Sequence, residues 1–311
     1  MRKTCLDQIY ELAKRDSRVV FIGSDIGSGT LEHFKREIPN RFFMEGVSEA
    51  HLVSMMAGLA MEGKIPYMNT IATFMTRRPF EQIVLDAGLH KTKVRLIGSG
   101  SGAVYGPLGP THLALDDIAI LRVIPGMTIV APCDADEMKR LMLQTLDYDG
   151  PIYIRLAKGG DPIVSRPDFP FKIGQAIVLR EGDDVLLVST GITTQIALET
   201  AAILEREKIF STVIHIHTLK PLDRKRLRTH MEKVHAIVSI EEHFITGGLG
   251  SAVAEVLAES DFDAVKRFVR VGFPDEFIHT YGSQSELMKK YGITSQNIAN
   301  VVAKMLNSKL V

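Results

Sequence analysis

The chain has 311 residues, of which 45% are hydrophobic and 24% are charged, and its 37 basic and 37 acidic side chains cancel. This balance and the lack of a basic stripe argue against a nucleic-acid partner, and no apolar run has the length of a membrane-spanning helix. Two cysteines are too few for a disulfide framework or a Cys-rich zinc site, so we expect Cys5 and Cys133 to be small buried side chains. The N-terminal residues do not resemble a secretion signal, and we expect a cytoplasmic protein.

Short apolar runs alternate with helical patterns along the first half of the chain. The runs are rich in β-branched residues and end at Gly, Ser or Pro, as buried parallel strands do, and they cover residues 19–25, 93–100, 127–132 and 151–157. A helical pattern over 134–146 begins at Asp134, a candidate N-cap. This alternation predicts an α/β fold with right-handed crossovers.

A nearly continuous apolar helix is predicted over residues 52–61, with the acidic residue Glu49 at its start. The pattern predicts a helix that is buried on nearly every side. Ser48 is its candidate N-cap, and an acidic residue in the first turn is favoured by the helix dipole. From this stretch alone, capping is a sufficient explanation of Glu49, because caps are common and catalytic carboxyl groups are rare.

A second α/β unit is predicted after a segment rich in proline and glycine, residues 159–171. We place the domain boundary there and predict two parallel-sheet-based α/β domains, 1–165 and 173–311. Beyond the boundary the apolar runs resume, a helix is expected over 193–207, and two closing helices are expected near the C-terminus. The runs of this second unit cover residues 183–191, 210–221 and 236–243.

Several side chains in the loops after the strands have ordinary structural explanations. His112 follows a Gly-Pro-Thr turn and would usually be a loop histidine, while Phe74 and Phe80 would usually be core aromatics. His215 and His217 alternate along one predicted strand, and we do not predict them to be metal ligands. None of these features indicates a function alone.

The order of six motifs resembles the C-terminal half of a transketolase over nearly the whole chain. Glu49 at the start of the buried helix is followed in the family's order by "TFMTR", "GPTH", "PCDADE", "KPLD" and "EEHFITGGLG". The resemblance implies a pyrimidine-binding domain of a thiamine-diphosphate enzyme, followed by the transketolase C-terminal domain. It implies transfer of a two-carbon ketol or acyl unit to an aldehyde acceptor.

The resemblance also assigns cofactor contacts. In the family, the glutamate of this helix hydrogen-bonds N1′ of the thiamine diphosphate pyrimidine and promotes the imino tautomer that removes the thiazolium C2 proton, a role carried onto Glu49. Phe74 matches the aromatic residue that stacks on the pyrimidine, and Phe80 lies near another aromatic position of the family. Arg77 matches an arginine of deoxyxylulose-phosphate synthases. The cofactor contacts are completed by a loop that contains Asp25 and Ile26.

The substrate contacts follow the family in part. His112 matches the histidine that faces the reacting substituent, and Arg155 matches an arginine that holds a substrate phosphate. Leu108 replaces an aspartate that contacts a sugar hydroxyl in transketolases, and Gly100 replaces a histidine for the sugar phosphate. Both changes put the usual pentose phosphates in doubt, because neither residue can make the expected hydrogen bond.

The family binds the diphosphate and Mg²⁺ through a Gly-Asp-Gly motif, and this sequence contains none. We therefore expect the metal ligands on a separate partner subunit, with this chain a homodimer inside an α₂β₂ heterotetramer. Three alternatives remain: the beta subunit of a 2-oxo acid dehydrogenase first component, a deoxyxylulose-phosphate-synthase-like carboligase, and a non-catalytic scaffold. The Gly-Pro-Thr-His string favours the transketolase, and the intact glutamate argues against a scaffold.

Overall fold

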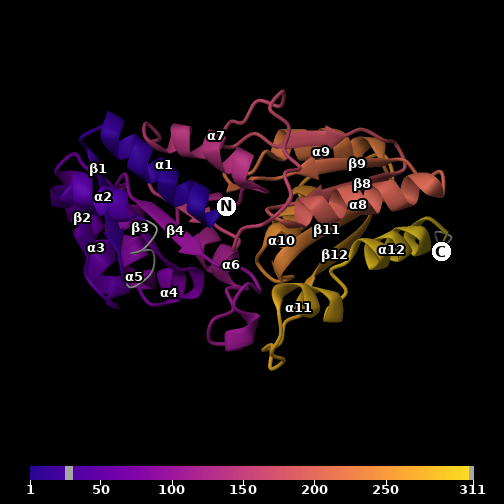
Figure 1. Cartoon of the computed structure of the whole chain (residues 1–311). Helices are drawn as coiled ribbons and strands as arrows, with labels where there is room; N and C mark the ends of the chain where they lie inside the picture. Colours follow the sequence, from indigo (N-terminus) through magenta and orange to yellow (C-terminus); the bar gives the residue numbers. More distant parts are fainter. Residues whose placement is uncertain (25–30, 308–311) are drawn as a thin grey trace.

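The computed structural model of the chain describes residues 1–24 and 31–307. Figure 1 shows two halves side by side, the N-terminal half in indigo to magenta and the C-terminal half in orange to yellow. Each half is built on one mostly parallel sheet with helices packed on both faces. The structure therefore has the two-part α/β architecture that the alternating pattern predicted.

Seven strands form the sheet of the N-terminal half, in the spatial order β10-β5-β6-β4-β3-β1-β2. Six strands of this half pair in parallel with one another: β1 (Val19–Gly23), β2 (Phe42–Met44), β3 (Ile65–Ile71), β4 (Arg95–Ser99), β5 (Thr128–Val130) and β6 (Ile152–Arg155). The seventh strand, β10 (Thr218–Lys220), comes from the C-terminal half and pairs antiparallel with β5. A segment beyond the proline-rich stretch thus completes the first sheet.

The helices of the N-terminal half cover both faces of this sheet. One face is covered by α1 (Arg2–Arg15), α2 (Glu32–Glu37) and α7 (Ala135–Thr145). Segments on the other face include α3 (Glu49–Met61), the π-helix η3 (Ile83–Leu89) and α6 (Asp117–Arg122). Shorter helices complete the half: η2 (Pro39–Arg41), α4 (Ala72–Arg77), α5 (Phe80–Gln82) and η4 (Gly106–Leu108).

The sheet of the C-terminal half has five strands in the order β12-β11-β8-β9-β7, all parallel except β7 against β9. The strands are β7 (Ile177–Arg180), β8 (Val185–Ser189), β9 (Ser211–His215), β11 (Ala236–Phe244) and β12 (Arg267–Phe273). The helices are α8 (Thr193–Arg206), α9 (Arg224–Lys233), α10 (Leu249–Ala258), α11 (Gln284–Lys290) and α12 (Ser295–Asn307). One hydrophobic cluster contains residues of both sheets, so the two halves share part of their core.

Two local expectations about helix ends have different outcomes. Asp134 is the N-cap of α7, and its carboxylate accepts hydrogen bonds from the backbone N–H groups of Asp136 and Glu137 at 3.0 and 2.9 Å. Ser48 occupies the N-cap position of α3, but within the described part of the chain its side chain makes no capping hydrogen bond. The cap explanation of this helix start is therefore wrong for Ser48.

Helix α3 is less enclosed than its sequence predicts. Leu52, Val53 and Met56 are fully buried, whereas Met61 is 57% exposed and Ser54 lies on the exposed side of the helix. The prediction of burial on nearly every side is wrong for the single chain, which leaves one partly apolar face of α3 uncovered. In the residues 1–24 and 31–307, no helix combines the length and the apolar character needed to cross a membrane.

Candidate active site

Glu49 lies buried at the N-terminal end of α3, where the helix dipole favours a negative charge. The residue is 3% exposed, and its carboxylate accepts two hydrogen bonds from Nη1 of Arg78, at 3.0 Å to Oε2 and 3.2 Å to Oε1. Arg78 follows the last residue of α4 and its side chain is 44% exposed. A buried carboxylate therefore faces a cation that can reach solvent.

The aromatic ring of Phe74 lies beside this ion pair. The guanidinium carbon of Arg78 is 3.8 Å from the centroid of the Phe74 ring, which is the geometry of a cation–π contact. Phe74 also lies next to His112, whose ring centroid is 5.2 Å away in an edge-on arrangement. Three elements that are distant in the sequence thus bring Glu49, Phe74 and His112 to one place.

Arg77 faces a different part of the molecule. Its guanidinium group pairs with the Asp116 carboxylate at 2.9 Å and donates a hydrogen bond to the carbonyl oxygen of Leu113. Arg77 borders a cavity of about 270 Å³ whose walls come from both halves of the chain and include Pro110, Asp116, Phe244 and Phe277. Of the two neighbouring arginines, Arg78 contacts Glu49 and Arg77 lines this cavity.

The positions that depart from the transketolase pattern lie on the loop between β4 and α6. Leu108 ends the short helix η4 and is 52% exposed. Gly100 has a φ of +68°, and a Cβ atom there would overlap Cε2 of Tyr105. A histidine at this position would require both a strained backbone and a different Tyr105 conformation. Phe80, in α5, is partly buried against the shared core.

Arg155 lies inside the molecule where the two halves meet. Its side chain is 7% exposed, and Nε donates to Oδ2 of Asp117 at 2.8 Å. Nη2 donates to the carbonyl oxygen of Glu242 at 2.9 Å, and the hydroxyl group of Tyr153 donates to the same Asp117 oxygen at 2.8 Å. Burial opposes the positive charge of Arg155, but the neighbouring Asp117, Glu242 and Tyr153 together outweigh it and raise the pKa of the guanidinium group. These bonds tie α6 and β6 to β11.

The "EEHFITGGLG" motif forms a second set of buried bonds in the C-terminal half. Glu241 accepts hydrogen bonds from the backbone N–H groups of Leu249 and Gly250, at 2.7 and 2.8 Å, so it caps the start of α10. Glu242 accepts from the backbone N–H of Ala103 at 2.7 Å and from Gln284 at 2.8 Å. Burial raises the pKa of each carboxyl group to about 7. The motif therefore joins the two halves and positions a helix.

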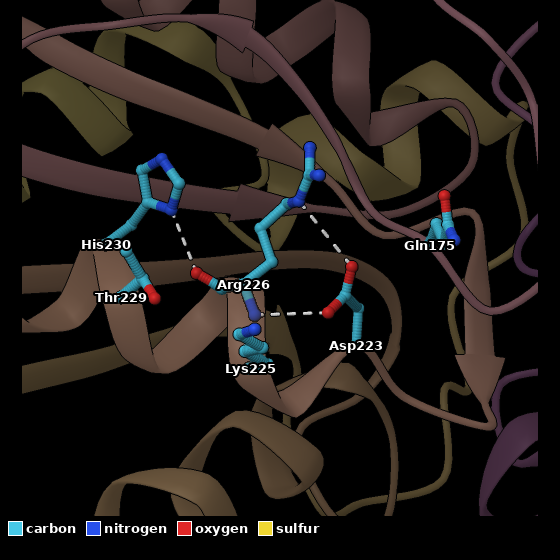
Figure 2. A pocket seen from close by; sticks show the side chains of 6 residues that line it. All are labelled: Gln175, Asp223, Lys225, Arg226, Thr229 and His230. Carbon is cyan, nitrogen blue, oxygen red and sulfur yellow. Dashed lines mark hydrogen bonds and ion pairs between the residues drawn. The ribbon is translucent and has the colours of Figure 1, made fainter.

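A separate surface hollow of about 450 Å³ lies beside α9 and is drawn in Figure 2. Asp223 accepts a hydrogen bond from the backbone N–H of Arg226, and the imidazole Nδ1 of His230 lies 2.9 Å from the carbonyl oxygen of that arginine. Asp223 also accepts from the backbone N–H of Ala176. The polar atoms of Asp223 and of His230 Nδ1 are thus used in hydrogen bonds within the chain.

Two family models together match most of the chain. The description "Transketolase, pyrimidine binding domain" matches residues 1–160, and "Transketolase, C-terminal domain" matches residues 174–298. The chain belongs to the transketolase family. The recognition of the family from the order of its motifs, and the fold class that came with it, are confirmed.

Relatives of this transketolase-family chain include proteins of nearly the same length. It is 34% identical to a protein of Phocaeicola vulgatus that is named as a subunit of an apulose-4-phosphate transketolase, over 98% of this chain and 97% of that protein. It is also 34% identical to the "6-deoxy-6-sulfo-D-fructose transketolase subunit SqwH" of a Clostridium species, over 99% and 95%. A "1-deoxy-D-xylulose-5-phosphate synthase" of Heliobacterium modesticaldum is 35% identical over 97% of this chain but only 46% of that protein.

Solved structures agree with this family assignment. One titled "Split gene transketolase, inactive beta4 tetramer" superposes with a TM-score of 0.90 at 36% identity and covers 99% of both chains. A transketolase from Pichia stipitis superposes with a TM-score of 0.81 at 17% identity over 45% of its length, which supports the fold alone. The chain thus corresponds to the C-terminal half of a transketolase.

The structure brings together some of the predicted site residues and separates others. Glu49, Phe74 and His112 lie near one another, whereas Arg155 is buried where the halves meet. Asp25 and Ile26 lie outside the described residues. Sequence reasoning missed Arg78, although the Arg-Arg doublet in "TRRPF" marks two candidates for one arginine position.

Proposed function

We propose that this chain is the pyrimidine-binding subunit of a thiamine-diphosphate-dependent, transketolase-type transferase. The observation that carries the proposal is the buried Glu49 carboxylate next to the Phe74 ring, with the Arg78 guanidinium group bound to both. A guanidinium group is planar, rich in N–H donors and able to stack on an aromatic ring. The space between Glu49 and Phe74 is thus suited to a planar group with N–H donors, and an aminopyrimidine ring is such a group.

The residues of this chain have distinct tasks in the proposed enzyme. With the cofactor bound, Glu49 would exchange a proton with the pyrimidine ring and Phe74 would contact the face of that ring, which requires Arg78 to move from its present contacts. His112, whose ring lies against Phe74, faces the reacting group and can donate or accept a proton there. The bound cofactor supplies the carbanion chemistry, and the protein supplies orientation and proton exchange. Phe80, Arg77 and Arg155 stay predicted cofactor or substrate contacts.

The second part of the proposal is that the diphosphate and Mg²⁺ are held by a partner subunit. The sequence has no Gly-Asp-Gly motif, and two relatives of nearly equal length are named as transketolase subunits. The exposed, partly apolar face of α3 is suited to a contact with a second copy of the chain. We propose an α₂β₂ assembly in which this chain is the smaller subunit.

The isolated chain is expected to show no Mg²⁺-dependent binding of thiamine diphosphate in a calorimetric titration, and to acquire it when the partner subunit is added. The physical reason is that the pyrimidine contacts alone lack ligands for the charged diphosphate and its metal ion. The control is the partner subunit titrated without this chain. Micromolar, Mg²⁺-dependent binding by the isolated chain would exclude the divided site.

Replacing Leu108 by Asp is expected to shift the preference of the complex towards hydroxylated aldose phosphates. A carboxylate that hydrogen-bonds a hydroxyl group discriminates against acceptors that lack it, whereas an apolar side chain discriminates weakly. The measurement is the ratio of kcat/KM for a hydroxylated and a deoxy acceptor, with the equally exposed Leu143→Asp as the control; these side chains are 52% and 54% exposed. An unchanged ratio would mean that Leu108 does not face the substrate.

A second candidate is a deoxyxylulose-phosphate-synthase-like carboligase. It is favoured by 35% identity to such a synthase over 97% of this chain and by the arginine doublet after Phe74. Both enzymes would use the same pyrimidine site, so the distinction lies in the donor. A complex that consumes pyruvate and releases carbon dioxide, and does not transfer a ketol unit, would favour the carboligase.

A further inference from the structure

A cluster of potential metal ligands lies buried where the two halves of the chain meet. Cys133 and Glu137 belong to the turn and first helical residues of α7, and His215 is the last residue of β9. One ligand atom from each of the three lies within 4.8 Å of the other two. All three side chains are buried, with exposed fractions of at most 2%. A thiol, a carboxylate and an imidazole thus converge from two sheets in an interior site.

Strand pairing explains how these residues meet. The antiparallel contact of β10 with β5 continues in a hydrogen bond of 2.7 Å from the backbone N–H of Ala131 to the carbonyl oxygen of His217. This contact places the end of β9 next to the start of α7. The sequence could not reveal it, because His215 lies 78 residues after Glu137.

The cluster and the adjacent His217 contain buried polar atoms without a hydrogen-bond partner among the described residues. Glu137 Oε2 accepts a hydrogen bond from the backbone N–H of Cys133 at 2.7 Å and lies 2.9 Å from Nε2 of His215. The second oxygen, Oε1, is buried without a hydrogen-bond partner in the described part of the chain, and so is Nε2 of His217. Buried polar atoms of native proteins are nearly always paired, so each of these two atoms calls for an explanation.

The surroundings hold the ligands in a suitable orientation. Thr194 Oγ1 lies 2.8 Å from Nδ1 of His215 and can accept a hydrogen bond from it, which leaves Nε2 free as a ligand atom. Metal-bound histidines usually have such an outer partner on the second ring nitrogen. Asp134 accepts hydrogen bonds from the backbone N–H groups of Glu137 and Ser165, so the turn that carries Cys133 is also fixed.

We propose that Cys133, Glu137 and His215 bind one divalent transition-metal ion, with zinc as the best chemical match. Zinc accepts sulfur, nitrogen and oxygen ligands together and is usually four-coordinate. Three positions are supplied by these side chains, and the fourth is flanked by His217, whose ring centroid is 5.8 Å from that of His215. The ion would cross-link the start of α7 in the N-terminal half to β9 in the C-terminal half through its ligands.

Charge and proton balance are consistent with this site. Glu137 would bind the ion as a carboxylate and His215 as a neutral imidazole, which are the forms that coordinate metal ions. Cys133 would release its thiol proton to solvent as the metal–sulfur bond forms. A thiolate and a carboxylate together neutralise one divalent cation, which makes the buried cluster neutral.

The first test is the metal content of the full-length protein. Protein incubated with equimolar zinc sulfate and then desalted is expected to retain close to one zinc per chain by elemental analysis. Cys133→Ser should lose most of this zinc, whereas Cys5→Ser should keep it, since Cys5 is an equally buried thiol outside the cluster. A wild-type protein that retains no zinc, or a Cys133→Ser protein that retains all of it, would overturn the proposal.

The second test uses only the wild-type protein, so its result does not depend on whether a variant folds. Wild-type protein loaded with Co²⁺ is expected to show the near-ultraviolet absorption of a cobalt–thiolate bond together with the visible bands of a tetrahedral ion. Chelator treatment should remove these bands and lower the melting temperature. Bound cobalt without thiolate absorption would exclude Cys133 as a ligand. A melting temperature that does not change on removal of the metal would show that the ion does not stabilise the contact between the two halves.

Discussion

Glu49→Gln is expected to reduce kcat of the complex with the partner subunit by about 10²–10⁴-fold, the usual loss when a general acid–base group is removed. Glutamine has the length of glutamate and can still accept a hydrogen bond from Arg78, but its amide group cannot exchange a proton. The fold and the assembly should therefore survive while turnover is lost. The measurement is steady-state turnover, together with thermal unfolding and size-exclusion chromatography of the complex.

The matched control is Glu45→Gln, which removes an exposed carboxyl group four residues before Glu49. It should leave kcat, melting temperature and assembly unchanged. Glu49→Asp adds a test of geometry, because the shorter side chain cannot reach as far and should also reduce turnover. Near wild-type turnover of the Glu49→Gln complex would show that the carboxyl group serves only to pair with Arg78.

Asp117→Ala is expected to lower the free energy of unfolding by about 3–5 kcal/mol, the cost of removing one partner from a buried ion pair. The reason is that Arg155 would keep its charge inside the molecule without the carboxylate that compensates it. The measurement is the midpoint of urea unfolding. The neighbouring Asp116→Ala is the control, because its pair with Arg77 is partly exposed and such pairs contribute at most about 1 kcal/mol.

A double variant separates the cost of an unpaired charge from the value of the pair. Replacing Asp117 by Leu and Arg155 by Met at the same time removes both charges and keeps apolar volume. Such replacements are often neutral or stabilising by about 1–4 kcal/mol, so the double variant should recover most of the loss. If Asp117→Ala costs no more than Asp116→Ala, the buried network does not hold the halves together.

The sequence was sufficient for the fold class because its signals are local. Parallel strands that are buried on both faces appear in the sequence as continuous apolar runs. Asp134 is a residue type that favours the N-cap, and it directly precedes a helical pattern. Ser48 is also a typical N-cap residue at the start of a helix, but its side chain makes no capping hydrogen bond in the described part of the chain. Residue type alone therefore does not determine whether a capping hydrogen bond forms. The exposed face of α3 was missed because an apolar sequence does not tell whether the neighbour that covers it belongs to the same chain.

The proposed site could be predicted only where one motif specifies one residue. Glu49 and Phe74 follow from family motifs, whereas the choice between Arg77 and Arg78 depends on a difference of one position. Successive residues of a helix point about 100° apart, so that difference sends one arginine to Glu49 and the other to the Asp116 side. The cluster around Glu137 depends on a contact between distant strands, and no local pattern encodes it.

The pairing of β10 with β5 means that the two halves of this protein cannot be expressed as separate fragments without loss of a strand from the N-terminal sheet. A fragment that ends in the proline-rich segment would lose β10 and leave the edge of β5 unpaired, and open strand edges promote aggregation. The complementary fragment would carry a strand with no sheet to join. Exchange of halves between relatives should therefore succeed only when residues Thr218–Lys220 of the C-terminal half still pair with β5 of the N-terminal half.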